Sequence, residues 1–172
     1  MKGQWTKVYS GDLPLRSWWV DSGSDCKYIS IVLPEVFGIN HWIRSFSEKL
    51  ASHNVSVLAL PLYGRTAPKL DLGYSEKELK LGRHHKNLTT LKHIIEKVSG
   101  KLNFICGSSD DLIPLQDRLE IKKRFKKLDP LEERFIYVEV KGADHGFMCE
   151  ERESFHKDAS SIGWNLLMKE LN

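Results

Sequence analysis

Three titratable side chains each follow an apolar stretch of the sequence by a few residues. Glu35 follows residues 28–33, and Asp110 and His145 follow two later stretches. An acid after one strand and a histidine after the next supply two of the groups that acyl transfer needs. The carboxylate orients the imidazole, which then takes a proton from a nucleophile. Taken singly, Asp110 is explained as well by a helix cap and His145 by an ordinary loop histidine. Together, with glycines beside both, they indicate an acid–base pair.

The stretches that precede these residues have the pattern of buried parallel strands. Each is a continuous apolar run, and such runs are typical of strands that are covered on both faces. They occupy residues 28–33, 55–60, 102–106 and 135–140. Because ligands bind beyond the carboxyl ends of such strands, we expect Glu35, Asp110 and His145 to lie at one edge of the sheet.

Segments of helical period alternate with the strands. Their apolar residues recur at spacings of three and four, which predicts helices over residues 40–52, 88–98, 114–128 and 158–171. Asn40 is a suitable N-cap for the first of them. Strands that alternate with helices in this way predict an α/β fold with a three-layer, doubly wound, mostly parallel sheet.

The remaining segments complete the expected domain. The first 20 residues alternate in places around Gly11 and predict an antiparallel hairpin at the edge of the sheet. Residues 63–86 show little periodicity and predict a long loop. The chain contains no repeat and no linker, so we expect a single domain over residues 1–172.

The composition argues against several classes of partner. Lys and Arg total 26 and Asp and Glu total 23, interspersed along 172 residues, so neither nucleic acid nor a membrane surface is expected to bind. The basic run at residues 122–127 lies within a helical pattern and is explained as a solvated helix face. No apolar run reaches the ~18 residues of a membrane span.

Cysteines and histidines give no metal-ligand pattern. The three cysteines are an odd number, which favours free thiols in a reducing cytoplasm. His84 and His85 are adjacent, so their side chains point in different directions from a helix or a strand. We expect neither a metal nor a cofactor.

Four segments of the sequence resemble the dienelactone hydrolase family of α/β-hydrolases. They are VLPEVFGINHWIR at 32–44, LALPLYGRTAP at 58–68, ICGSSDDLIP at 105–114 and GADHGFMCEERESFHKDASSIGW at 142–164. The resemblance implies a shortened α/β-hydrolase fold and a cytoplasmic hydrolase of small carboxylic esters or lactones. A homodimer is compatible with this sequence.

The resemblance also implies roles for individual residues. Asp110, rather than its neighbour Asp111, matches the catalytic acid, and His145 matches the base. Glu35 matches the carboxylate that restrains the family's nucleophilic cysteine, and the backbone amide of Val36 matches an oxyanion donor. Two further residues that follow strands, Phe37 and Arg65, are expected to contact the substrate.

One segment of the family has no counterpart in this chain. Where members carry a strand, a glycine-cysteine-glycine elbow, a helix and another strand, this sequence has only residues 99–101, and neither G-x-C-x-G nor G-x-S-x-G occurs in it. Cys106 is the candidate nucleophile by position, although Phe104 stands where the elbow needs glycine. Cys149 has a counterpart beside the family's nucleophile and is expected to pack, and Cys26 is given no role.

Three functions therefore stay open. The chain is a hydrolase with an unusual nucleophile, a non-catalytic ligand-binding or regulatory remnant of the fold, or an internally deleted product with a weakened fold. In each case we expect Asp110 and His145 to be within hydrogen-bonding distance. We also expect the strand at 102–106 to lie beside the strand at 28–33, in the place of the missing strand.

Overall fold

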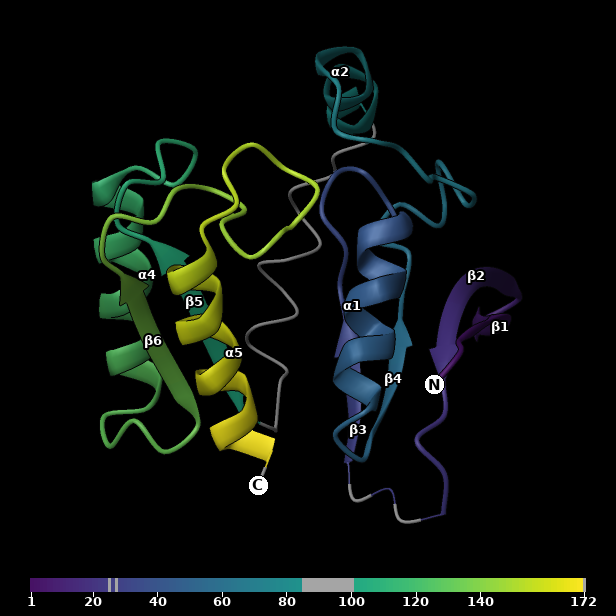
Figure 1. Ribbon diagram of the computed structural model, residues 1–172, viewed down its shortest axis with the longest axis horizontal. Helices are drawn as coiled ribbons and strands as arrows, with labels where there is room; N and C mark the ends of the chain where they lie inside the picture. Colours follow the sequence, from purple (N-terminus) through teal and green to yellow (C-terminus); the bar gives the residue numbers. More distant parts are fainter. Residues whose placement is uncertain (25, 27, 85–100, 172) are drawn as a thin grey trace. The chain divides into compact units, whose positions relative to one another are not determined.

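The computed structural model describes residues 1–24, 26, 28–84 and 101–171 (Figure 1). The chain divides into two compact units, Met1–Leu88 and Thr89–Asn172, and each is described here by itself. The helix predicted at 88–98 lies outside the described residues. The expectation of one domain over residues 1–172 stays a prediction.

The predicted N-terminal hairpin is present in the first unit. Strands β1 (Gln4–Ser10) and β2 (Leu13–Val20) pair in antiparallel register, and Gly11 takes the positive φ of 60° that the turn requires. The other edge of β2 pairs with a strand of the following segment, so the hairpin is continuous with the first sheet.

The predicted β-α-β segment follows the hairpin. Strands β3 (Tyr28–Val32) and β4 (Val55–Ala59) are parallel and are joined by helix α1 (His41–Ala51), which lies along them in Figure 1. Asn40 caps the helix as predicted, because its side chain accepts a hydrogen bond from the backbone N–H of Ile43 at 3.1 Å. The strand order in this sheet is β1-β2-β4-β3.

The prediction that the β3 segment is buried on both faces is wrong. Ile29 is 67% exposed and Ile31 is 61% exposed. The strand order places β3 at the edge of its sheet, and α1 packs on the face that carries Val32 and Ala59. A short apolar run indicates a strand, but it does not distinguish an edge strand from a central one.

The prediction of an uninterrupted loop over residues 63–86 is also wrong, because helix α2 (Glu76–His84) forms within it. Ser75 and Glu78 make a reciprocal capping box. The backbone N–H of Glu78 donates to the Ser75 hydroxyl at 3.3 Å, and the Glu78 carboxylate accepts from the backbone N–H of Ser75 at 3.2 Å. Gly82 lets the helix approach the chain at Val36, whose carbonyl oxygen would lie 2.2 Å from a Cβ at that position.

The second unit contains the other predicted strands and helices. Parallel strands β5 (Leu102–Gly107) and β6 (Phe135–Val140) form a two-stranded sheet, and the helices are α4 (Leu115–Leu128) and α5 (Lys157–Leu171). Phe125 of α4 packs against Phe104 and Phe135, whereas Ala159 of α5 belongs to a cluster with Val140. The helices therefore cover opposite faces of the strands (Figure 1).

The described strands of each unit form one sheet. β3 pairs with β4 in the first unit, and β5 pairs with β6 in the second. Each of these pairings uses one edge of β3 or β5. The prediction that β5 lies beside β3, in the place of the missing strand, concerns the two units together and stays a prediction.

Acidification is expected to weaken the start of α2. Hydrogen bonds from Ser75 and Gly73 hold the pKa of Glu78 below its ordinary value. Because this pKa is lowered in the folded chain, the ionised Glu78 carboxylate contributes its full stabilisation of the helix start above the ordinary Glu pKa. This contribution is lost as the pH falls through the lower, folded-state pKa. Hydrogen exchange of the Gly73 and Ser75 amides, measured over this pH range, should show the loss. Glu78→Gln should remove the pH dependence, and an unchanged profile in that variant would contradict the assignment.

Candidate active site

The loops that follow β5 and β6 are joined by hydrogen bonds at one edge of the two-stranded sheet. The N–H of Ser108 donates to the Val140 carbonyl at 2.9 Å, and the N–H of Ser109 donates to the Ala143 carbonyl at 2.9 Å. In return, the Ser108 hydroxyl accepts from the N–H of Gly142 at 2.8 Å. These bonds fix the acid loop against the histidine loop.

Gly107 makes the approach of the two loops sterically allowed. A Cβ at this position would lie 2.1 Å from the carbonyl oxygen of Ala143, far inside van der Waals contact. Any other residue would force the two backbones apart. The glycine that precedes the acid loop therefore has a packing function.

Asp110 is buried and accepts three hydrogen bonds. Its side chain is 3% exposed, and its Oδ1 accepts from the N–H groups of Leu112 at 2.9 Å and Ile113 at 3.1 Å. Its Oδ2 lies 2.8 Å from Nδ1 of His145, so the predicted hydrogen bond between the two residues is present. Asp110 thus closes its own loop and contacts the histidine, but it does not cap α4, whose N-cap residue is Pro114 and which has no side-chain cap.

His145 has the geometry of an oriented base. In the neutral imidazole, a carboxylate that accepts at Nδ1 assigns the proton to that nitrogen and leaves Nε2 with its lone pair. Among the residues that the structure describes, Nε2 has no hydrogen-bond partner, and the side chain is 31% exposed. The backbone is held on both sides, since the His145 N–H donates to Asp144 Oδ1 and its carbonyl accepts from the Ser154 hydroxyl, each at 2.6 Å.

Arg118 of α4 holds the acid loop from within, and the sequence analysis missed it. Its guanidinium is buried and donates to the backbone carbonyls of Ser108 at 2.9 Å, Asp110 at 3.1 Å and Ile113 at 2.7 Å. The signal in the sequence was its position seven residues before Phe125, on the same buried face of the helix. A charged residue on such a face needs buried partners.

Glu139 of β6 balances the charge of this guanidinium. Its Oε1 lies 3.5 Å from Nε of Arg118, and its Oε2 accepts from the Tyr137 hydroxyl at 3.0 Å. Burial, followed by hydrogen bonds to Cys106 and Glu139, raises the pKa of Tyr137 above its ordinary value. The hydroxyl therefore stays protonated and acts as a donor.

Cys106 lacks the environment of a nucleophile. It is 4% exposed, and its thiol lies 3.5 Å from the Tyr137 hydroxyl. Burial raises the pKa of this thiol, whereas a reactive cysteine needs a lowered pKa because the thiolate is the attacking form. No hydrogen bond joins Cys106 to His145 in the described part of the chain.

The other predicted site residues belong to the first unit. Phe37 is 3% exposed and packs edge-on against Tyr74 with ring centroids 4.6 Å apart, while Arg65 is exposed. Glu35 and Val36 lie in the turn after β3, which closes with a hydrogen bond from the N–H of Gly38 to the Glu35 carbonyl at 3.2 Å. The convergence of these residues with Asp110 and His145 stays a prediction.

The described residues contain no group of three or more His, Cys, Asp or Glu side chains placed to hold a metal ion. None of their helices has the length and apolar composition of a membrane span.

Removing the Arg118 guanidinium is expected to destabilise the acid loop strongly. Arg118→Met leaves three carbonyls and the Glu139 carboxylate without their partner, a class of change that costs about 3 to 5 kcal/mol. Arg118→Lys should cost less, because an ammonium keeps the charge. Arg124→Met, on the exposed face of the same helix, is the matched control and should change the free energy of unfolding by less than ~0.5 kcal/mol. Equal effects of the two Met variants in urea denaturation would contradict this role.

Sequence and structure comparisons identify proteins that are similar to this chain. The chain is 22% identical to a Synechocystis protein named as a carboxymethylenebutenolidase, over 79% of this chain and 82% of that protein. A crystal structure from Klebsiella pneumoniae, named as a dienelactone hydrolase, superposes with a TM-score of 0.69 at 16% identity, over 97% of this chain and 96% of that one. A dienelactone hydrolase-like promiscuous phosphotriesterase from metagenomic libraries gives a TM-score of 0.68 at 13% identity, over 96% and 95% of the two chains.

These superpositions establish the α/β-hydrolase fold that the sequence predicted. The sequence profile of the Dienelactone hydrolase family matches residues 85–172, just over half of the 172 residues and the part that carries Asp110 and His145. The chain therefore belongs to the dienelactone hydrolase family.

Proposed function

We propose that this chain hydrolyses small carboxylic esters or lactones slowly, with His145 as general base and Asp110 as the carboxylate that orients it. The observation that carries the proposal is the 2.8 Å hydrogen bond between His145 Nδ1 and Asp110 Oδ2. Family membership and the names of the relatives support an ester or lactone as the substrate. A cytoplasmic location and a reaction without a cofactor belong to the same proposal.

The proposed reaction uses water as the direct nucleophile. His145 Nε2 takes a proton from water while the water oxygen bonds to the acyl carbon, and the carbonyl π electrons move onto the carbonyl oxygen. The imidazolium then returns the proton to the leaving alkoxide as the acyl C–O bond breaks, which gives the acid and the alcohol. The Asp110 carboxylate orients the imidazole and stabilises the imidazolium.

The family resemblance implies further roles for residues of the first unit. They are an oxyanion donor at the backbone amide of Val36, a restraining carboxylate at Glu35 and substrate contacts at Phe37 and Arg65, and these roles stay predictions. A single oxyanion donor typically contributes about 10²- to 10³-fold in rate.

Three observations favour water over an acyl-enzyme mechanism. The sequence contains no nucleophile elbow, and the alignment with the Synechocystis relative spans 204 positions, more than the 172 residues of this chain, so the relative has residues without a counterpart here. Burial also keeps the Cys106 thiol protonated. A site without its covalent nucleophile retains only a residual fraction of the family's rate.

The missing elbow also supports a second candidate function, a non-catalytic ligand-binding module that keeps the acid–base pair. The two candidates differ in one measurable property. If the chain is a non-catalytic module, ester hydrolysis in its presence should proceed at the same rate with the wild type and with a variant that lacks the imidazole. If it is the proposed hydrolase, the variant should be slower.

His145→Asn is expected to abolish a slow hydrolysis of 4-nitrophenyl acetate. A general base contributes about 10²- to 10⁴-fold in rate, so the variant should lose at least about tenfold and approach the buffer rate. Asp110→Asn should lose a comparable factor, because the imidazole would be held in the wrong tautomer. The visible absorbance of the released 4-nitrophenolate, followed over time, gives the rates.

The controls separate the water mechanism from its alternatives. His53→Asn replaces an exposed histidine of the first unit and should leave the rate unchanged. Cys106→Ala and Cys149→Ala should also keep the activity, and a loss in Cys106→Ala alone would replace water by that thiol. Turnover near the enzyme median of about 10 s⁻¹ would show that the chain holds an unrecognised nucleophile.

A further inference from the structure

Two cations lie directly opposite each other on the N-terminal hairpin. The β1–β2 register pairs Lys7 with Arg16, so their side chains project from the same face of the two strands. Like charges in this position destabilise a hairpin, and here neither cation has an acidic partner among the described residues. An arrangement that costs stability is the expected signature of a binding function.

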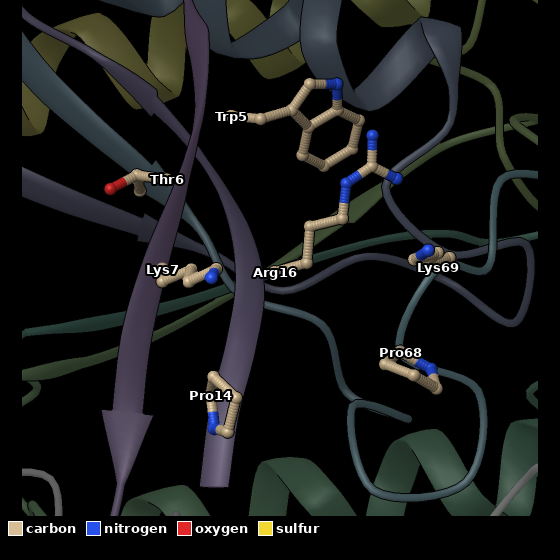
Figure 2. Close-up of a pocket in the computed structure, with 7 residues that line it drawn as sticks. All are labelled: Trp5, Thr6, Lys7, Pro14, Arg16, Pro68 and Lys69. Atoms are coloured by element: carbon tan, nitrogen blue, oxygen red, sulfur yellow. The ribbon is translucent and has the colours of Figure 1, made fainter.

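The same face of the hairpin forms one wall of a pocket (Figure 2). The pocket has a volume of about 580 Å³, within the range of small-molecule sites. Its lining residues are Trp5, Thr6, Lys7, Pro14, Arg16, Pro68 and Lys69. Three of them are cationic, three carry apolar rings, and no acidic side chain is among them.

Arg16 is held in a fixed orientation by Trp5. Its guanidinium carbon lies 3.6 Å from the centroid of the indole, and Figure 2 shows the two groups against each other. Stacking occupies the flat face of the guanidinium and leaves its N–H edge for an anion, which it can bind with two parallel hydrogen bonds. Arg16 is half-buried, so less of this charge is solvated than at a fully exposed site.

Lys69 adds a third positive charge from the loop across the pocket. The acid nearest to it in the sequence, Asp71, is already paired with Arg44 at 2.6 Å. Lys69 itself has no ion pair among the described residues. The pocket therefore carries three uncompensated positive charges beside an apolar wall of Trp5 and two prolines.

We propose that this pocket binds a small organic anion that carries two negative groups on a planar apolar body, the chemistry of an aromatic dicarboxylate. Arg16 holds one carboxylate through its N–H edge, and Lys7 and Lys69 neutralise the second. The ring of the ligand contacts Trp5, Pro14 and Pro68. This site lies wholly in the first unit and includes neither Asp110 nor His145, so it is independent of the proposed hydrolysis.

Phthalate is the probe for this site in the full-length protein. Calorimetric titration at constant ionic strength should give a Kd on the order of 1 mM or below, with a shift of the Trp5 indole N–H resonance assigned through Trp5→Phe. Arg16→Gln and Lys69→Gln should each weaken binding by about tenfold or more. Lys77→Gln removes an exposed lysine of the same unit that does not line the pocket, and it should leave the Kd unchanged.

Lys7→Gln keeps the proposal testable if the other variants fold poorly. Without ligand it should melt at the same temperature as the wild type or higher, because it removes a like-charge pair, and phthalate should raise its melting temperature less than that of the wild type. Equal affinity for inorganic phosphate and phthalate would overturn the role of the apolar wall. Undiminished binding in Arg16→Gln, or no saturation by about 10 mM in the wild type, would overturn the site itself.

Discussion

The close approach of Gly107 to Ala143 determines the geometry of the second unit. Parallel pairing of β5 and β6 brings both carboxyl ends to one edge, but only the missing side chain at Gly107 lets the two loops come into hydrogen-bonding contact. Asp110 is then within hydrogen-bonding distance of His145, and the guanidinium of Arg118 donates hydrogen bonds to the backbone carbonyls of the acid loop. The two loops are held together by hydrogen bonds of backbone groups that directly follow β5 and β6, so the position of the loops depends on the sheet.

The chemistry of the site is consequently uneven. Its proton-transfer half is well defined, since a buried carboxylate orients an imidazole whose second nitrogen is accessible. Among the described residues of the second unit, its nucleophilic half is less developed, because the thiol of Cys106 is buried beside Tyr137 with a raised pKa. The general base and a covalent nucleophile would depend on different segments of the chain.

Much of this fold follows from local sequence patterns, and the exceptions have physical causes. The hairpin, the β3–α1–β4 segment, the strands β5 and β6 and the Asn40 cap depend on periodicity and on short-range hydrogen bonds, and all were predicted. Helix α2 was missed although Ser75 and Glu78 have the spacing of a capping box, because Leu79 and Leu81 are the only large apolar side chains in the helix. The exposure of β3 depends on which strands pair, which no local pattern specifies.

The candidate site divides in the same way. Asp110 and His145 were predicted because each follows a strand in a segment with recognisable flanking glycines. Arg118 and Glu139 were not, since their roles arise from a pairing between a helix face and a strand that only the folded chain brings together. Glu35, Phe37 and Arg65 of the first unit were chosen because they follow predicted strands, and the roles of Glu35 and Val36 came from the family resemblance.

The hydrogen bond between Asp110 and His145 spans 35 positions of the chain, and this separation has a kinetic consequence. Contacts between residues so far apart in the sequence form slowly, because the conformational entropy of the intervening segment must be lost before the contact is gained. The acid–base pair therefore needs the parallel pairing of β5 and β6 across the α4 connection. A chain that keeps its helices but lacks this strand pairing would have no oriented base.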